Sequence, residues 1–339
     1  MRMRPYTERR RGSSAFRVVA VYLGMSLSMA SAGLTANAQA RARCSLPSAR
    51  SSHAMVFDEA RGQVLLFGGV GDGPSPNNQL WGWTDGAWQL LSESGPEPRL
   101  DPVMVYDAGR ERVMLFGGQN FPALYGDTWE WDGAQWTKVT EAGPGPRAHT
   151  AAAYDRARGK VILFGGYDPA LDRHVGDTWE WDGVAWTRLD VVGPSARGVH
   201  AMGFDERTNV VLLFGGLPDN GQILRDTWAW DGKTWQLKDG FGPLQLPGRV
   251  LTQLGPAGDV MFFGGMEGGR LHDETWLWTG ERWLGFQGPA PKKRALHGVA
   301  YVTTRQSVLL FGGIKAGNKA LRDAWEFRDG AWNKLPKCP

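Results

Sequence analysis

An apolar run that ends in two glycines occurs six times in this chain, at a nearly constant interval. The first copy reads QVLLFGG and the last reads SVLLFGG. The second glycines are separated by 49, 48, 50, 49 and 48 residues, and they are Gly69, Gly118, Gly166, Gly216, Gly265 and Gly313. A period of this length indicates stacked copies of one supersecondary unit. The repeat therefore constrains the fold more strongly than any other feature of the sequence.

Each repeat contains four short segments with the character of β-strands. They are clearest in the second copy, at residues 103–106, 113–116, 127–131 and 136–139. The first two segments are apolar on both faces, so both faces must be covered by neighbouring sheets. In the third segment, Trp129 and Trp131 alternate with polar residues, which places both rings on one face of a strand. The 47 glycines and 17 tryptophans fit many short strands, tight turns and aromatic side chains between sheets.

The third and fourth strands are expected to join through a two-residue type I′ turn. The pattern Asp–Gly tolerates the positive φ angles that this turn requires. It recurs as Asp85–Gly86, Asp132–Gly133, Asp182–Gly183, Asp231–Gly232 and Asp329–Gly330.

A single four-stranded sheet cannot cover two apolar faces, whereas six sheets stacked around an axis can. Ring closure also leaves no terminal sheet face exposed, and an open stack would need polar capping repeats, which neither end of the array provides. The sequence therefore predicts an all-β fold, a six-bladed β-propeller of four-stranded antiparallel blades, with negligible helix in residues 45–339.

Several further marks recur in register with the glycine pairs. An arginine precedes the first strand, a histidine often follows it three residues later, and an aspartate stands two residues before the third-strand tryptophan. The arginines are Arg50, Arg99, Arg147, Arg197, Arg249 and Arg294, and the fourth-strand tryptophans are Trp88, Trp136, Trp186, Trp235, Trp283 and Trp332. With these marks the chain resembles the kelch-repeat β-propellers, of the bacterial secreted type and the type of the galactose oxidase central domain. The resemblance covers residues 47–335 and implies a fold rather than a function, because propellers serve both as binding modules and as enzymes.

The N-terminus has the organisation of a secretory signal peptide. Three consecutive arginines, Arg9 to Arg11, precede an apolar segment at 18–34, and small residues follow up to Ala38 or Ala40. We expect a signal peptide at 1–40, a propeller at 41–339, and a secreted or periplasmic location. An uncleaved membrane anchor is the alternative, although serines interrupt the apolar segment. No other segment is long enough to span a membrane.

Charge argues against a nucleic-acid partner. The whole chain has a formal charge of +3, but residues 1–40 contain six arginines and one glutamate. The remaining 32 basic and 34 acidic residues give the repeat region a net charge of −2. No basic stripe suited to phosphate binding is visible there. The protein is also expected to be a monomer.

Neither a metal nor a cofactor is expected. His53, His200 and His297 share one repeat position, but Pro102, Thr150 and Thr252 occupy it in other repeats, so a packing role is favoured over a metal ring. The aspartates Asp127, Asp177, Asp226 and Asp323 are expected to pair with the repeat arginines rather than to bind calcium. A copper-radical site of the galactose oxidase type is rejected, because it needs a cysteine within the repeats.

The loops after the second and fourth strands vary most among the repeats, and antiparallel alternation places them on one face of the disc. Variation on a rigid scaffold marks a recognition surface, although drift in unselected loops would look the same. The residues predicted to bind a ligand are Phe121, Tyr125, Tyr167, Arg173, His174, Arg270 and His272. We expect joint replacement of Tyr125, Tyr167 and Arg173 to abolish binding while leaving stability nearly unchanged.

The sequence is compatible with two functions. The first is a binding module for a protein or a carbohydrate. The alternative is a small-sugar enzyme such as a sialic-acid mutarotase, which resembles this chain in being a secreted six-bladed kelch ring and needs an acid and a base in one pocket. A buried carboxylate, arginine and histidine at the channel mouth would favour the enzyme, and a flat or apolar face would favour the binding module.

The two cysteines are predicted to form a disulfide. Most fourth-strand tryptophans lie 11 residues before the next repeat arginine, as Trp88 lies before Arg99. Cys338 follows Trp332 by six residues and Cys44 precedes Arg50 by six, so both would fall at neighbouring positions of a linker joining the last blade to the first. An oxidising compartment would permit this bond.

Overall fold

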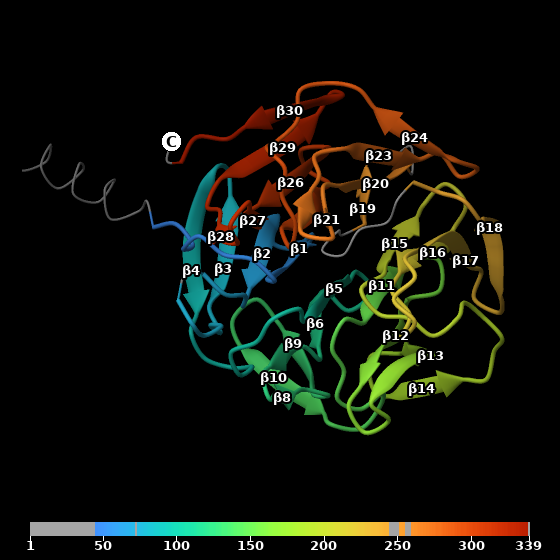
Figure 1. The fold of residues 1–339 in the computed structure, drawn as a ribbon. Helices are drawn as coiled ribbons and strands as arrows, with labels where there is room; N and C mark the ends of the chain where they lie inside the picture. Colours follow the sequence, from blue (N-terminus) through green and yellow to red (C-terminus); the bar gives the residue numbers. More distant parts are fainter. Residues whose placement is uncertain (1–44, 72, 244–250, 255–258, 338–339) are drawn as a thin grey trace, which may run out of the picture. The chain divides into compact units, whose positions relative to one another are not determined.

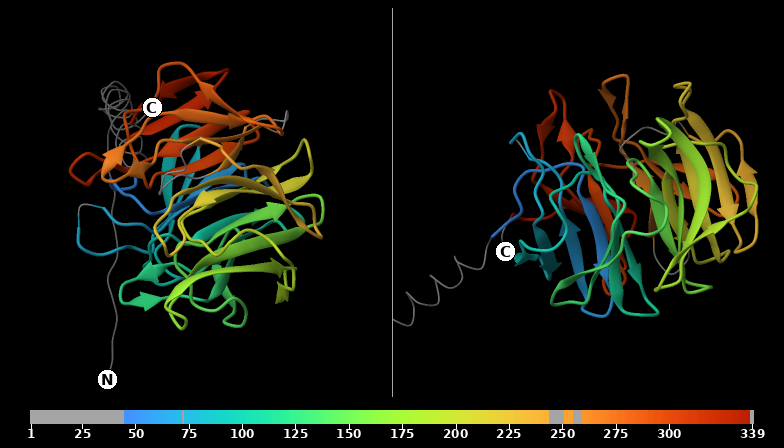
Figure 2. Two further views of the ribbon diagram at one scale, coloured as in Figure 1. Left: turned by 45° about the vertical axis from the view of Figure 1, so that its right-hand side comes forward. Right: turned by 90° about the horizontal axis from the view of Figure 1, so that it is seen from below.

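Six four-stranded sheets are arranged around a central axis (Figures 1 and 2). The computed structural model describes residues 45–71, 73–243, 251–254 and 259–337, which belong to the compact unit Ser45–Pro339. Every sheet is built from one repeat, its strands pair antiparallel in chain order, and these residues contain no helix. The predicted six-bladed β-propeller is therefore confirmed.

The strands of the first three blades have the following bounds. Blade 1 consists of β1 (Ala54–Asp58), β2 (Gln63–Phe67), β3 (Leu80–Thr84) and β4 (Ala87–Ser92). Blade 2 consists of β5 (Val103–Asp107), β6 (Arg112–Phe116), β9 (Thr128–Trp131) and β10 (Trp136–Thr140). Blade 3 consists of β11 (Ala151–Asp155), β12 (Lys160–Asp168), β13 (Arg173–Trp181) and β14 (Trp186–Leu189).

The other three blades follow the same plan. Blade 4 consists of β15 (Ala201–Asp205), β16 (Val210–Gly216), β17 (Leu224–Trp230) and β18 (Trp235–Asp239). Blade 5 consists of β19 (Thr252–Leu254), β20 (Asp259–Phe263), β23 (Thr275–Trp278) and β24 (Trp283–Phe286). Blade 6 consists of β25 (Gly298–Val302), β26 (Ser307–Phe311), β29 (Ala324–Arg328) and β30 (Ala331–Lys334).

Three small hairpins extend the loops between the second and third strands. They are β7–β8 (Gln119–Asn120 and Ala123–Leu124), β21–β22 (Met266–Glu267 and Arg270–Leu271) and β27–β28 (Ile314–Lys315 and Lys319–Ala320). In blade 3, β12 and β13 themselves continue into such a hairpin, with Asp168 opposite Arg173. Together with the linkers between blades, these hairpins form one face of the ring, which we call the loop face.

The ring closes without exchange of a strand between the two ends of the chain. Figure 1 shows the first strands nearest the axis and the fourth strands at the periphery. The first strand of each blade contacts the first strands of both neighbouring blades, including β25 against β1. A backbone hydrogen bond from Ser52 N to Leu296 O (2.9 Å) also joins blade 1 to blade 6. Each repeat is therefore a complete blade, as the sequence predicted.

The hydrophobic core consists of six large clusters, one between each pair of adjacent blades, and a small seventh one on the loop face. The second strands supply its centre, because both of their faces are buried: Val64, Leu65, Leu66 and Phe67 of β2 are inaccessible to solvent. This explains why these strands are continuous apolar runs rather than alternating ones. The fourth-strand tryptophans pack against phenylalanines of the preceding blade, as Trp235 does against Phe164 with ring centroids 5.7 Å apart.

Buried arginine–aspartate pairs connect the start of a blade to its third strand in four of the six blades. The predicted pairs are present in four blades, and Arg197 is typical, with Nη1 2.6 Å from Asp226 Oδ1 and Nη2 2.9 Å from Oδ2. The other three are Arg99–Asp127, Arg147–Asp177 and Arg294–Asp323. In blade 1 the amide oxygens of Asn77 and Gln79 replace the carboxylate around Arg50, and burial lowers the pKa of that arginine to about 10.

The predicted two-residue turn is correct in blades 1 and 6 and wrong in blades 2, 3 and 4. Both turn residues have positive φ at Asp85–Gly86 (50° and 89°) and at Asp329–Gly330 (52° and 72°). In the other three blades only the glycine does, because the aspartate directly follows the strand tryptophan and stands one position earlier in the loop. There the carboxylate accepts hydrogen bonds from two backbone N–H groups, as Asp132 Oδ1 does from Ala134 and Gln135 (both 2.8 Å).

Candidate functional site

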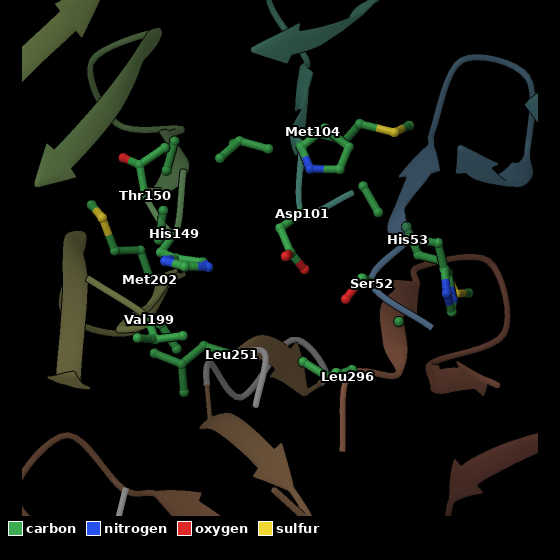
Figure 3. Close-up of a pocket in the computed structure, with 18 of the residues that line it drawn as sticks. Ser52, His53, Asp101, Met104, His149, Thr150, Val199, Met202, Leu251 and Leu296 are labelled. Carbon is green, nitrogen blue, oxygen red and sulfur yellow. The ribbon is translucent and has the colours of Figure 1, made fainter. Parts of the chain in front are cut away.

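The mouth of the central channel on the loop face is formed by the second residue after each repeat arginine. The residue before it forms a β-bridge to the residue that follows the glycine pair, as Leu100 does to Gln119. In five blades the second residue has a positive φ angle between 50° and 59°, which turns its side chain toward the axis (Figure 3). The six residues in blade order are Ser52, Asp101, His149, Val199, Leu251 and Leu296.

Backbone hydrogen bonds hold some of these residues in place across blade boundaries. Asp101 N donates to Ser52 O and Val199 N donates to His149 O, both at 2.9 Å. The positive φ angles are unusual for residues other than glycine. Such backbone conformations persist where surrounding structure imposes them, and they concentrate at functional sites.

The mouth opens into a cavity of about 230 Å³ whose two sides differ in polarity. Blades 1 to 3 contribute Ser52, Asp101 and His149, which we call the polar arc. Blades 4 to 6 contribute Val199, Leu251 and Leu296, which we call the apolar arc. Figure 3 shows the carboxylate of Asp101 and the imidazole of His149 directed toward the same central space. The ring thus presents hydrogen-bonding groups on one side and aliphatic groups on the other.

Gln119 connects the two titratable groups of the polar arc. Its Nε2 lies 3.4 Å from Asp101 Oδ2 and 3.4 Å from His149 Nε2. Burial raises the pKa of Asp101, against the opposing effects of His149 and of hydrogen bonds from Ser52 and Gln119. Burial lowers the pKa of His149, and the charge of nearby His174 adds to this effect while Asp101 opposes it. The carboxyl group thus retains a proton more readily than usual, and the imidazole loses one more readily.

A second layer of polar groups lies beside His149 on blades 3 and 4. His174 Nδ1 is 2.6 Å from Asp219 Oδ1, and the rings of His174 and Tyr167 meet edge-on with centroids 5.9 Å apart. A Cβ atom on Gly198 would lie 2.6 Å from His174 Cδ2 and 3.2 Å from His149 Cβ. The absence of a side chain at Gly198 therefore allows the two histidines to lie close together.

The seven residues predicted to bind a ligand are not brought into one cluster. Tyr167 and His174 lie beside the polar arc, whereas Phe121, Arg173 and Arg270 are exposed on hairpins of three different blades. Tyr125 stacks on the buried guanidinium of Arg99, 4.0 Å from its ring centroid, and His272 Nδ1 lies 3.2 Å from Glu274 Oε2. Tyr125 therefore has a packing role, which makes it unsuitable for a variant that should leave stability unchanged.

Neither the polar arc nor Gln119 was predicted from the sequence. The histidines recur at the third residue after the repeat arginine, whereas the second residue lines the mouth. A signal was present, because that second position reads Ser, Asp, His, Val, Leu and Leu through the six repeats. A change from polar to apolar types at one repeat position indicates a surface that differs from blade to blade.

The recurring histidines are buried packing residues. His53, His200 and His297 each meet a phenylalanine of the preceding blade, with ring centroids 5.5 to 5.8 Å apart. Burial lowers the pKa of His53 and of His200 to about 3, with the neighbouring repeat arginine adding to the effect. Within the described part of the chain, no three histidine, cysteine, aspartate or glutamate side chains are grouped as metal ligands would be.

No protein-family model matches the chain, and no curated protein is significantly similar to it. A search of the described residues finds no helix that is both long and apolar enough to cross a membrane. Residues 1–40 and both cysteines lie outside the described residues, so the signal peptide and the disulfide stay predictions. The architecture alone therefore classifies this protein: it is a six-bladed β-propeller whose channel mouth is polar on one side and apolar on the other.

Proposed function

We propose that this chain is an exported kelch-type β-propeller that binds a small saccharide at its channel mouth. The division of the mouth into a polar and an apolar arc carries the proposal. A sugar ring offers hydroxyl groups that both donate and accept hydrogen bonds, together with C–H groups that pack against aliphatic side chains. Asp101, His149 and Gln119 supply the matching acceptors and donors, and Val199, Leu251 and Leu296 supply the aliphatic surface.

The size of the cavity supports a small ligand rather than a protein. Pockets for small molecules usually measure about 300–1,000 Å³, and this one, at about 230 Å³, is slightly smaller than that range. A stable protein partner would instead bury roughly 800 Å² of each surface. The kelch assignment is supported by the arginine–aspartate pairs, the glycine pairs and the fourth-strand tryptophans, which all occupy the positions that the resemblance implies.

The binding proposal is tested by glycan-array screening followed by calorimetry on the saccharides that bind. The variants Asp101→Asn and His149→Gln should each weaken binding at least tenfold, since each replaces a buried group that faces the ligand. The double variant Tyr167→Phe/Arg173→Gln tests the loop residues predicted from the sequence and should weaken binding without lowering thermal stability. Exposed Lys233→Gln on blade 4 is the control. Wild-type affinity in both mouth variants would contradict the proposal.

An acid–base enzyme acting on a small sugar is the second candidate, and one observation favours it. Asp101 and His149 share one cavity, and burial raises the pKa of the carboxyl and lowers that of the imidazole, which favours a protonated carboxyl that can donate a proton and a neutral imidazole that can accept one. No arginine lines this cavity among the described residues, so only two of the three groups expected of a mutarotase-like site are present. NMR exchange measurements on single anomers decide between the candidates. Faster anomer exchange with the wild type, and loss of this effect in Asp101→Asn, would establish catalysis. Binding without faster exchange would favour the binding module over the enzyme.

A further inference from the structure

A second pocket lies on the loop face between blades 5 and 6, away from the polar arc. It is open, measures about 600 Å³, and is formed by the β21–β22 hairpin, the linker before blade 6 and the β27–β28 hairpin. Four cationic side chains and one carboxylate line it: Arg270, Lys292, Lys293, Lys315 and Asp273. We call it the basic pocket.

The cations of the basic pocket differ from most arginines of the ring because no carboxylate of the described residues lies within ion-pair distance of them. All four are exposed, and none forms an ion pair with a described residue, whereas Arg99, Arg147 and Arg197 each pair with an aspartate. Four positive charges and one negative charge leave a local net charge of +3. The repeat region as a whole has a net charge of −2, so this concentration does not reflect a generally basic surface. Unpaired cations gathered around a concave surface indicate a site for an anion.

The basic pocket shares an apolar wall with the channel mouth. Leu271 lines the basic pocket and packs in a cluster with Ala295 and Ile314. Leu296, which belongs to the apolar arc of the mouth, packs against the same cluster. A ligand that occupies the mouth can therefore extend over this wall into the basic pocket.

We infer that the basic pocket binds a sulfate or phosphate ester group carried by the saccharide that occupies the mouth. Three of the four cations are lysines, whose ammonium groups act as mobile point charges rather than as a planar fork matched to a single carboxylate. Several such charges around one pocket fit a phosphate ester, which carries close to two negative charges, or several sulfate esters on adjacent positions, better than an isolated carboxylate. This inference deepens the proposed function and depends on it for the saccharide, but not for the anion site.

The test compares polymers that share one backbone and differ only in their substituent. Affinities are measured for dextran, dextran sulfate, dextran phosphate and carboxymethyl-dextran, with poly-glutamate as an acidic polypeptide. Dextran sulfate or dextran phosphate should bind at least tenfold more tightly than carboxymethyl-dextran and poly-glutamate, and whichever binds more tightly identifies the ester. This binding should weaken as salt is raised from about 50 to 500 mM, because salt screens exposed charges.

The triple variant Lys292→Gln/Lys293→Gln/Lys315→Gln should lose at least tenfold in affinity for the esterified dextran. The matched control is Lys233→Gln/Lys238→Gln/Lys334→Gln, which removes the same charge from exposed positions of blades 4 and 6 outside the pocket. Equal losses in both triple variants would overturn the inference, since the attraction would then come from overall charge. Equal binding of poly-glutamate and the esters would overturn it in favour of an acidic protein partner.

These experiments test the saccharide site at the mouth and the anion site in the basic pocket independently. Loss of ester binding in the lysine variant but not in Asp101→Asn would support the anion site while contradicting a shared saccharide. Binding of array saccharides that depends on Asp101 but not on the lysines would support the mouth and overturn the basic pocket.

Discussion

Removing the carboxylate of Asp226 should destabilise the ring by leaving a buried guanidinium without its counter-charge. The side chain of Arg197 is 1% exposed and donates two hydrogen bonds to Asp226, and the indole of Trp228 donates a third at 2.7 Å. In Asp226→Ala these three hydrogen bonds are lost, and the two guanidinium nitrogens keep only the neutral acceptors Gly215 O and Ser195 Oγ. In Asp226→Asn one amide oxygen remains, and blade 1 shows that amide oxygens can take the place of the carboxylate at the repeat arginine, since those of Asn77 and Gln79 lie 3.1 and 3.0 Å from Arg50.

The expected magnitudes follow from this geometry. Breaking a fully buried ion pair costs about 3–5 kcal/mol, and we expect about 3 kcal/mol for Asp226→Ala, because 19% of the aspartate side chain is exposed. Asp226→Asn should cost about 1–2 kcal/mol, since it loses charge-assisted bonds but keeps an acceptor. With an unfolding entropy of about 2.1 cal/mol/K per residue over roughly 295 residues, 3 kcal/mol corresponds to about 5 °C in Tm.

Calorimetry and urea unfolding followed by tryptophan fluorescence measure both effects, with the exposed Asp190→Ala as control. Burial acts to raise the pKa of Asp226, but the hydrogen bonds and charge of Arg197 outweigh it and hold the pKa below 3.8. The stabilisation is therefore complete above the unfolded pKa and is lost as the pH falls through the lower folded pKa. The difference between wild type and Asp226→Asn should be constant above about pH 5 and shrink below pH 4. A Tm change in Asp226→Ala no larger than that of Asp190→Ala would refute the reasoning.

Three further predictions concern other parts of the ring. Thr178→Val should lower the free energy of unfolding by about 1–3 kcal/mol, because the buried indole N–H of Trp235 loses its acceptor, the threonine hydroxyl 2.9 Å away. Urea unfolding measures this effect, and a midpoint equal to that of the wild type would contradict the prediction. Wild-type stability should fall as the pH drops below 6.5, because the unfolded state protonates His200 while burial holds its folded pKa at about 3. His200→Thr, which introduces the residue of blade 3 at this position, should reduce that slope by about 1.4 kcal/mol per pH unit, and an unchanged slope would argue against the buried neutral state. If the chain is exported to an oxidising compartment, as we propose, Cys44 and Cys338 should resist alkylation until reduced. Non-reducing mass spectrometry measures this, and two free thiols would exclude the disulfide.

The blades themselves could be predicted from the sequence because their determinants are local and recur six times. The apolar second strand, the glycine pair and the alternating tryptophans each lie within a few residues of one another. The pairing of Arg99 with Asp127 also followed, since both mark the same end of one repeat. The turn at Asp132 was predicted wrongly, because the aspartate stands one position earlier in the loop than the type I′ turn requires. Asp132 is therefore the first residue of the turn rather than one of its two central residues. Agreement among many local signals specifies a fold even where one of them is misread.

The residues that line the channel mouth could be identified only from the tertiary structure. Ser52, Asp101 and His149 are about one repeat apart in the chain, and only ring closure brings their side chains to the same axis. Burial in the assembled ring shifts the pKa values of Asp101 and His149, and each of the two groups opposes the shift of the other, so no single repeat contains the information. The role of Tyr125 was likewise decided by a contact across the blade, with Arg99. Hydrophobic alternation and turn chemistry act over a few residues, whereas the character of a central cavity is set by one residue from each blade and by the positive φ angles that turn them inward.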